Sequence, residues 1–173
     1  MKKYVILFVL GMLLFTGCTT QEPFEPPQLE EFVSEDGSFS IMLPGKPEFE
    51  TQTVDTELGD INYYSYSIEV GGVGYVASYS DYPEEFIEAS AAEQLLDGAR
   101  DGSIVGGTLT NEEIISINGY PGREFTVSFR EGIFRTRLYL VNNRLYNIFV
   151  RIPKNRMKDV TGTDVLSSFK LLE

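Results

Sequence analysis

The chain contains no histidine, no tryptophan and a single cysteine, Cys18. The absence of histidine excludes Ser-His-Asp and Cys-His catalytic relays and any metal site built on imidazole. One cysteine cannot form a disulfide within the chain, so burial and hydrogen bonds must stabilise the fold. Basic residues are scarce as well, since 14 Lys and Arg stand against 26 Asp and Glu. Such an acidic chain repels nucleic acid, which excludes a nucleic-acid-binding function.

Apolar residues are plentiful by contrast. They make up 42% of the 173 residues, and aromatic residues are frequent, with 12 Phe and 10 Tyr. This composition builds a core and argues against wholesale disorder. The length suits one ordinary domain.

A short apolar segment follows Lys2 and Lys3 at the start of the chain. It runs from Val5 to Phe15, and as a helix its eleven residues would span about 16 Å, roughly half of a hydrocarbon core. A positive flank, a short apolar centre and small residues before a cleavage point are typical of a secretory signal. We therefore interpret residues 1–17 as a signal peptide.

The next feature is the sequence Phe15-Thr16-Gly17-Cys18, which resembles the lipobox of bacterial prolipoproteins. That pattern has a Leu-like residue, a small residue, Gly or Ala, and then Cys; Phe15 departs from the usual Leu. The resemblance implies cleavage after Gly17, a diacylglyceryl group on Cys18 and an acyl chain such as palmitate on the new amino end. Two or three chains hold a protein on a membrane essentially permanently. The alternative is a plain signal peptide with an incidental cysteine.

Residues 18–31 are then the lipid anchor and a tether rich in Pro and Glu, and residues 32–173 form a single domain. From Thr19 to Glu31 the tether would reach about 20 Å as a coil and about 40 Å when extended. The expected location is extracytoplasmic and membrane-anchored. Because Thr19 rather than Asp follows the cysteine, we expect the outer membrane in a Gram-negative host, and otherwise the outer face of the cell membrane.

The domain is mostly strands. Period-two patterns and turn residues predict strands at 39–43, 48–54, 61–70, 73–79, 112–117, 123–130, 133–141 and 144–152. Tight connections at Gly71-Gly72, Asn118-Gly119 and Asn142-Asn143 predict antiparallel hairpins. One main helix opens at Pro83 with an apolar stripe of Ile87, Ala91, Ala92, Leu95, Leu96 and Ala99. A short terminal helix begins at Thr161-x-x-Asp164.

The fold class is therefore α+β, an antiparallel sheet of about six to eight strands with one main helix and a short C-terminal helix. The phrases FSIMLPGKP, YSDYP, INGYPGREF and SSFKLL resemble a class of exported bacterial proteins similar in layout to PsbP-type and DcrB-like domains. The resemblance covers Phe32 to Leu172. PsbP proteins are non-enzymatic accessory subunits of photosystem II, so it implies the fold and an accessory character.

Arginines gather on the predicted meander. Alternation places Arg135, Arg137 and Tyr139 on one face, and we expect Arg130 and Arg151 on the same face. Such a set would bind a carboxylate or phosphate. The alternative is that these arginines pair with acids of the first half beneath a helix or the tether. From Cys18 to Ala99 there is one base against 18 acids, which favours that alternative.

Tyrosines form a second candidate surface. The group considered comprises Tyr63, Tyr64, Tyr66, Tyr75, Tyr79 and Tyr82. Tyr63 and Tyr64 must face opposite sides of their strand, so at least one layer is expected to be half exposed. Tyrosine-rich strands suit protein interfaces, and they equally suit ordinary sheet packing.

The sequence thus favours a lipid-anchored cell-envelope accessory or binding protein without catalytic activity, contacting a protein partner or a small anionic ligand. No catalytic residue, resident metal or cofactor is expected. Ser167-x-x-Lys170 matches one motif of penicillin-recognising enzymes, but the companion motifs are absent. A weak calcium-binding site on the acidic surface is a further hypothesis. The alternative function is a carboxylate- or metal-dependent envelope hydrolase.

Overall fold

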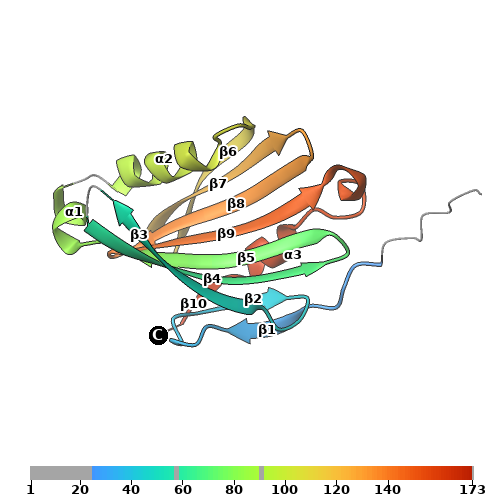
Figure 1. Cartoon of the computed structure of the whole chain (residues 1–173), viewed down its shortest axis with the longest axis horizontal. Helices are drawn as coiled ribbons and strands as arrows, with labels where there is room; N and C mark the ends of the chain where they lie inside the picture. The colour runs from blue at the N-terminus through green and yellow to red at the C-terminus, as the bar shows by residue number, and fades with distance from the viewer. Residues whose placement is uncertain (1–24, 57–58, 90–91, 173) are drawn as a thin grey trace, which may run out of the picture.

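A seven-stranded antiparallel sheet forms the body of the protein in the computed structural model (Figure 1), which describes residues 25–56, 59–89 and 92–172. Its strands lie in the order β3-β4-β5-β9-β8-β7-β6. Their bounds are β3 (Glu48–Thr56), β4 (Gly59–Val70), β5 (Val73–Asp81), β6 (Thr108–Ile117), β7 (Tyr120–Phe129), β8 (Gly132–Val141) and β9 (Arg144–Pro153). Each pair of neighbouring strands is antiparallel.

Tight turns fix the register of these hairpins. Gly71 and Gly72 both have positive φ, as do Asn118 and Gly119. Two consecutive residues with positive φ give the type I′ turn, whose twist matches that of the flanking strands. A two-residue turn also pairs the residues on either side of it, so Val70 lies opposite Val73 and Val141 lies opposite Arg144.

One face of the large sheet is covered by a smaller layer. This layer is a three-stranded sheet with the order β1-β2-β10, formed by β1 (Glu30–Val33), β2 (Phe39–Leu43) and β10 (Lys170–Leu171), together with helix α3 (Thr163–Ser168). Aromatic rings fill the space between the layers: Phe39 lies 5.8 Å from Tyr66 and 5.9 Å from Tyr146, measured between ring centroids. These rings form the centre of the main core. We refer to this side of the sheet as the inner face.

The opposite face is covered only in part. Helix α2 (Ala92–Ser103) contacts β7 and β8 and buries Leu96 against Phe125, Val127 and Leu138. Helix α1 (Glu84–Ala89) precedes it at one end of the sheet, and a turn of 3₁₀ helix, η1 (Lys154–Arg156), follows β9 at the other (Figure 1). The main contacts of α2 are with β7 and β8, and we call the half of this face formed by β3, β4, β5 and β9 the open half.

The predicted α+β class is confirmed, together with its antiparallel strands. The strands form two sheets rather than one, because β1 and β10 pair with β2 and leave the large sheet. The predicted main helix is present as α1 and α2, and α3 begins at Thr163 because Gly162 before it has a φ of 73°. Among the described residues no helix is long and apolar enough to span a bilayer. The predicted signal peptide and Cys18 lie outside the described residues.

Two glycines provide a test of the packing. A Cβ atom added at Gly122 in β7 would lie 2.5 Å from the carbonyl oxygen of Leu138 and 2.6 Å from the ring of Tyr139. Gly98 in α2 has nothing within 4 Å of the same position. Gly122→Ala should therefore lower the free energy of unfolding by about 1–3 kcal/mol. Gly98→Ala should raise it by about 0.5–1 kcal/mol, because alanine favours the helix.

Urea denaturation of both variants measures these differences. Equal effects of the two substitutions would contradict the close approach of β7 and β8 at Gly122.

Candidate functional site

Two of the predicted arginines share one face of the sheet, and both already bind other groups of the protein. Arg135 and Arg137 point to the inner face, where Arg137 Nε donates to Glu124 Oε2 at 2.6 Å. Arg137 Nη1 also donates to the carbonyl oxygen of Leu166 at 3.1 Å, and Arg135 Nη1 to Thr163 Oγ1 at 2.8 Å. Helix α3 therefore lies over these arginines. Their carboxylate partner, Glu124, belongs to the second half of the chain, so the expected pairing with acids of the first half is wrong for this pair.

Arg130 and Arg151 do not share this face, as the sequence had suggested. The register of β8 and β9 places Arg151 opposite Phe134 and Val150 opposite Arg135, so Arg151 points to the other side of the sheet. Arg130 follows the end of β7 in a turn, where its side chain is 94% exposed and lies 3.7 Å from Glu131. The five predicted residues thus occupy three different places. Tyr139, next in the alternation, is buried in the main core.

The predicted tyrosine surface is largely interior. Tyr66, Tyr75 and Tyr79 are buried in the main core, and Tyr64 packs against it. Burial raises the pKa of the Tyr75 hydroxyl above its ordinary value. Tyr63 points to the opposite face and is partly exposed, so the expected opposition of Tyr63 and Tyr64 holds. An exposed tyrosine layer is therefore wrong for Tyr66, Tyr75 and Tyr79, because the small sheet covers the face to which they point.

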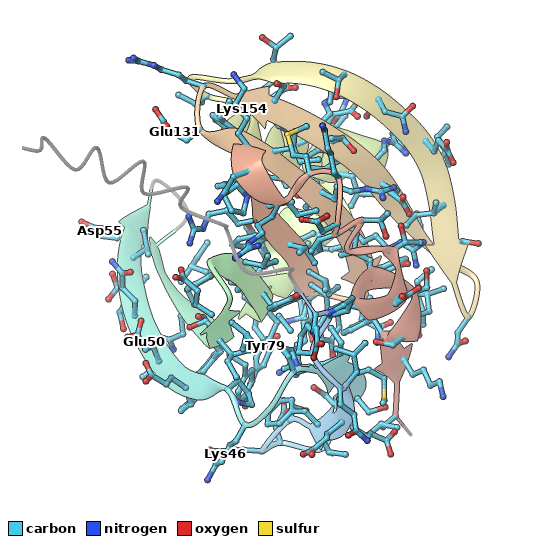
Figure 2. The ribbon with its side chains drawn as sticks, turned by 90° about the vertical axis from the view of Figure 1, so that its right-hand side faces the viewer. Lys46, Glu50, Asp55, Tyr79, Glu131 and Lys154 are labelled. Carbon is cyan, nitrogen blue, oxygen red and sulfur yellow. The ribbon has the colours of Figure 1, made fainter. Side chains whose placement is uncertain are left out.

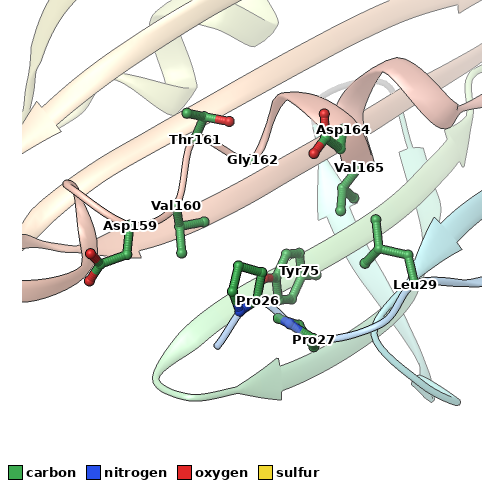
Figure 3. Close-up of a pocket in the computed structure, with 10 residues that line it drawn as sticks. All are labelled: Pro26, Pro27, Leu29, Tyr75, Asp159, Val160, Thr161, Gly162, Asp164 and Val165. Atoms are coloured by element: carbon green, nitrogen blue, oxygen red, sulfur yellow. The ribbon is translucent and has the colours of Figure 1, made fainter. Parts of the chain in front are cut away.

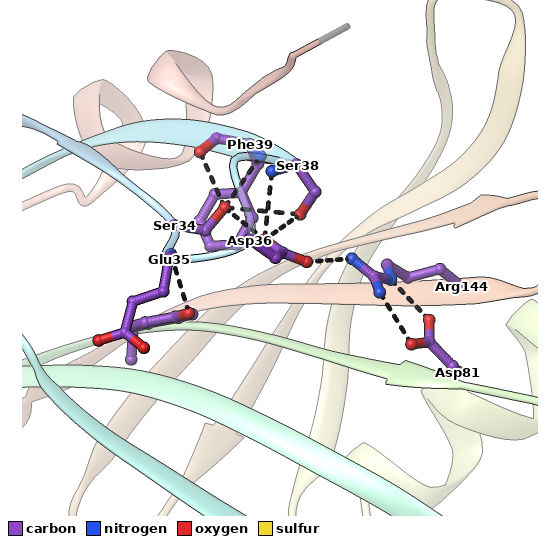
Figure 4. Close-up of polar contacts among 8 residues, drawn as sticks. Ser34, Glu35, Asp36, Ser38, Phe39, Asp81 and Arg144 are labelled. Carbon is purple, nitrogen blue, oxygen red and sulfur yellow. Dashed lines mark hydrogen bonds and ion pairs between the residues drawn. The ribbon is translucent and has the colours of Figure 1, made fainter.

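Sequence reasoning missed Arg144, which joins three segments at one end of the sheet (Figure 4). Its Nε and Nη2 bind the two carboxylate oxygens of Asp81 at 2.5 and 2.8 Å, and Nη1 binds Asp36 Oδ2 at 2.6 Å. The guanidinium carbon lies 4.0 Å from the centre of the Tyr79 ring. Asp81 pairs with Arg144 across β5 and β9, while Asp36 comes from the turn between β1 and β2. We call this group the Arg144 clasp.

Asp36 is held in its charged form within the clasp. Burial alone would raise the pKa of its carboxyl, but hydrogen bonds from Ser34, Ser38 and Arg144 outweigh burial and lower the pKa below its ordinary value. The Ser34 and Ser38 hydroxyls each lie 2.8 Å from Asp36 Oδ1. A carboxylate held so firmly in its ionised form is a poor proton donor near neutral pH. The clasp is therefore suited to joining segments.

A second ion-pair group holds α2 to the sheet. Arg123 of β7 is 6% exposed; it binds Glu93, and its Nη2 lies 3.3 Å from Asp97 Oδ1. Arg100 binds Asp97 and, at 2.8 Å, Glu112 of β6. The hydrogen bond that Arg123 donates to Glu93 raises the pKa of Arg123. Arg123 Nη1 is buried and has no hydrogen-bond partner among the described residues, but the other guanidinium contacts tie α2 to β6 and β7.

The open half, together with the adjoining ends of β7 and β8, carries the surface that we consider the candidate site. A hollow of about 470 Å³ is lined in part by Glu69, Val76, Phe149 and Arg151. A second hollow, of about 250 Å³, has mostly apolar walls that include Phe129, Phe134 and again Arg151. We call the residues named here the Arg151 surface; they are Glu69, Val76, Phe129, Phe134, Phe149 and Arg151.

The Arg151 surface combines aromatic rings with an accessible charge. The ring centroids of Phe134 and Phe149 lie 5.7 Å apart, and those of Phe129 and Phe134 lie 4.9 Å apart. The Arg151 side chain is 44% exposed and pairs with Glu69. Gly74 permits this position, since a Cβ there would lie 3.3 Å from Arg151 Nε. An arginine beside half-buried phenylalanines is the composition enriched at protein contact surfaces.

A third hollow lies where the segment just before β1, which we call the N-terminal arm, meets the domain (Figure 3). It has a volume of about 150 Å³ and is lined by Pro26, Pro27 and Leu29 on one side and by the segment from Asp159 to Val165 on the other. Part of the predicted tether thus packs against the loop before α3. Across the described parts of the chain, no group of three or more Asp, Glu, His or Cys side chains is placed to hold a metal ion.

Comparison with known proteins supports the fold. No protein-family model and no curated protein sequence matches the chain. Among solved structures, the cyanobacterial PsbP protein (CyanoP) of Synechocystis sp. PCC 6803 is similar, with a TM-score of 0.53 and 13% identity over 86% of this chain and 95% of that protein. A protein of unknown function from Pseudomonas aeruginosa matches 76% of this chain and 87% of that one at 10% identity, but its TM-score of 0.33 is too low to indicate a shared fold. The PsbP-like fold expected from the sequence is thereby confirmed.

The Arg144 clasp predicts a pH dependence of stability. Because the pKa of Asp36 is lower in the folded chain than in the unfolded one, its contribution is complete above the unfolded-state pKa of about 3.9. The contribution is lost as the pH falls from there toward the folded-state pKa. Asp36→Asn should therefore lower the free energy of unfolding by about 1–2 kcal/mol at neutral pH, and by less at about pH 3.

Urea denaturation at the two pH values measures this difference, with Asp55→Asn on the exposed strand β3 as the control. A loss for Asp36→Asn that stays the same at both pH values would show that the charge of Asp36 does not stabilise the clasp.

Proposed function

We propose that this chain is a non-catalytic accessory protein of the cell envelope, tethered through acyl chains on Cys18, that binds a protein partner through the Arg151 surface. The proposal joins the lipobox-like sequence at Cys18 to the composition of the open half. It assigns the chain to the class of binding proteins rather than to a class of enzymes.

The Arg151 surface is the observation that carries the proposal. Arginine and aromatic side chains contribute most of the binding energy at protein interfaces, chiefly where they lie in pockets from which a partner excludes water. Arg151 meets this condition, because it is 44% exposed and lines two hollows whose other walls include Phe149 and Phe134. A partner that covers these hollows would bury the three phenylalanine rings and enclose the pair between Arg151 and Glu69.

A protein partner is better supported than a small anionic ligand. Arg135 and Arg137, the arginines expected to bind an anion, already bind Glu124 and groups of α3. An incoming anion would have to displace these partners. Leaving the partly buried Glu124 carboxylate without its arginines would cost free energy. Arg151 has neighbouring carboxylates in Glu48 and Glu69, which disfavour a free anion there.

The commitment of charged groups to one another supports a non-catalytic function. General acid–base catalysis uses a carboxyl whose pKa lies near the working pH. The pKa of Asp36 is instead lowered, away from neutral pH. Glu93, Asp97 and Glu112 surround the arginines that hold α2. The alternative of an envelope hydrolase that depends on carboxylates or a metal receives no comparable support.

Site-specific crosslinking tests the partner surface. A photoreactive phenylalanine analogue at Phe149 should give a discrete protein adduct in intact cells. Arg151→Ala in the same background should reduce the adduct about tenfold, the usual loss at an interface hot spot. The fold should be unaffected, because an exposed ion pair such as that between Arg151 and Glu69 contributes little stability.

The matched control is the same analogue at Ile114, which is 78% exposed on β6. Adducts of the same species and yield from both positions, or a yield that Arg151→Ala leaves unchanged, would rule out the Arg151 surface as the contact.

A further inference from the structure

The N-terminal arm leaves the domain beside a basic segment. Pro26 and Pro27 lie against Asp159 and Val160, which follow η1 after two intervening residues (Figure 3). The arm and η1 both lie at the end of the sheet drawn at the right of Figure 1. The described start of the arm therefore lies beside η1.

Basic side chains gather at this end. Lys154, Arg156 and Lys158 lie in and just after η1, and Arg130 lies in the turn between β7 and β8. Figure 2 looks at this end and shows Lys154 close to Glu131 of that turn. Met157, in the middle of the basic segment, is 44% exposed. We call this group the basic end; it consists of the four bases Arg130, Lys154, Arg156 and Lys158, together with Met157.

The charge of the basic end is opposite to that of the chain. The two segments that form it, residues 130–131 and 154–159, contain four bases and two acids, whereas the whole chain has 14 bases and 26 acids. An acidic protein that carries a local basic surface turns that surface toward an anionic one. An exposed apolar side chain among the bases adds a group that can enter the headgroup region.

Backbone contacts hold the basic end in place. The amide of Lys154 donates to the carbonyl oxygen of Glu131 at 2.9 Å, which joins η1 to the turn between β7 and β8. Arg156 Nε donates to the carbonyl oxygen of Gly71 at 3.2 Å, which joins the same segment to the turn between β4 and β5. The bases therefore come from two connected segments, the η1 segment and the turn between β7 and β8, and the turn between β4 and β5 supports the first of them.

The length of the arm brings this surface within reach of the lipid. Pro26 lies eight positions after Cys18 in the sequence. Even fully extended, this stretch spans at most about 28 Å. An anchor at Cys18 therefore keeps the basic end near the headgroups, while the opposite end of the sheet is held farther away.

We propose that the basic end docks on anionic phospholipid headgroups and so orients the anchored domain on the membrane. The inference rests on the anchor in the proposed function and adds a second, electrostatic contact to it. Each base close to an anionic surface strengthens the contact about fivefold. The net positive charge that four bases and two acids leave then gives a reversible contact. Salt weakens this contact because it screens the charges.

The test uses the processed full-length chain in vesicles of phosphatidylcholine alone or of phosphatidylcholine with phosphatidylglycerol. A fluorophore is attached at Asn155→Cys in η1, and a nitroxide on the lipid headgroups reports the approach of the fluorophore. Quenching should be strong in the anionic vesicles and weak in the neutral ones. High salt should remove the quenching while the chain stays with the vesicles.

Lys154→Gln and Lys170→Gln form a matched pair. Both replace an exposed lysine and change the net charge equally, but Lys170 lies in β10 near the C-terminus, away from the arm (Figure 1). Lys154→Gln should lower the ratio of docked to undocked molecules about fivefold, and Lys170→Gln should leave the ratio unchanged.

Two failures are distinguishable. Equal quenching in both kinds of vesicle, or equal effects of the two substitutions, would overturn the docking while the anchor stands. A chain that separates from both kinds of vesicle would overturn the anchor and the docking together.

Discussion

The width of the large sheet is the constraint on which the rest of the structure depends. Seven strands about 4.8 Å apart make a surface roughly 29 Å wide, whereas a helix with its side chains is about 10 Å across. The inner face is covered by a second sheet and α3, whereas among the described elements α2 provides the main cover of the other face, over β7 and β8. The open half follows from this shortage of covering elements, and it leaves Phe149 and Arg151 accessible to a partner.

Ion pairs and hydrogen bonds of arginine side chains hold the covering elements in place. The Arg144 clasp ties the turn between β1 and β2 to the large sheet, Arg137 ties α3, and Arg123 ties α2. The proposed functions use what these pairs leave accessible, which is the Arg151 surface and the basic end. Both border the turn between β7 and β8, since Glu131 and Pro153 line the second hollow next to Lys154. A partner of the Arg151 surface would therefore be met close to the lipid.

Local features of the fold were predictable, and contacts between distant segments were not. Alternation and tight turns located the strands of the meander, and they placed Arg135 and Arg137 on one face correctly. The true face of Arg151 could also have been found, because the two-residue turn at Asn142 pairs Val141 with Arg144 and hence Phe134 with Arg151. No local pattern shows which face the small sheet covers, so the burial of Tyr66 and Tyr79 was missed. The contact between Asp36 and Arg144 joins positions 108 residues apart and depends on the assembled fold.

The central claim is that an acylated Cys18 places this domain at a membrane, with the basic end toward the lipid and the open half free for a partner. The most direct measurement is the intact mass of the chain recovered from the membrane fraction of its own cells. The account predicts a chain that begins at Cys18 and carries the added mass of a diacylglyceryl group on that residue. A chain with an unmodified Cys18, or one that retains residues 1–17, would contradict it.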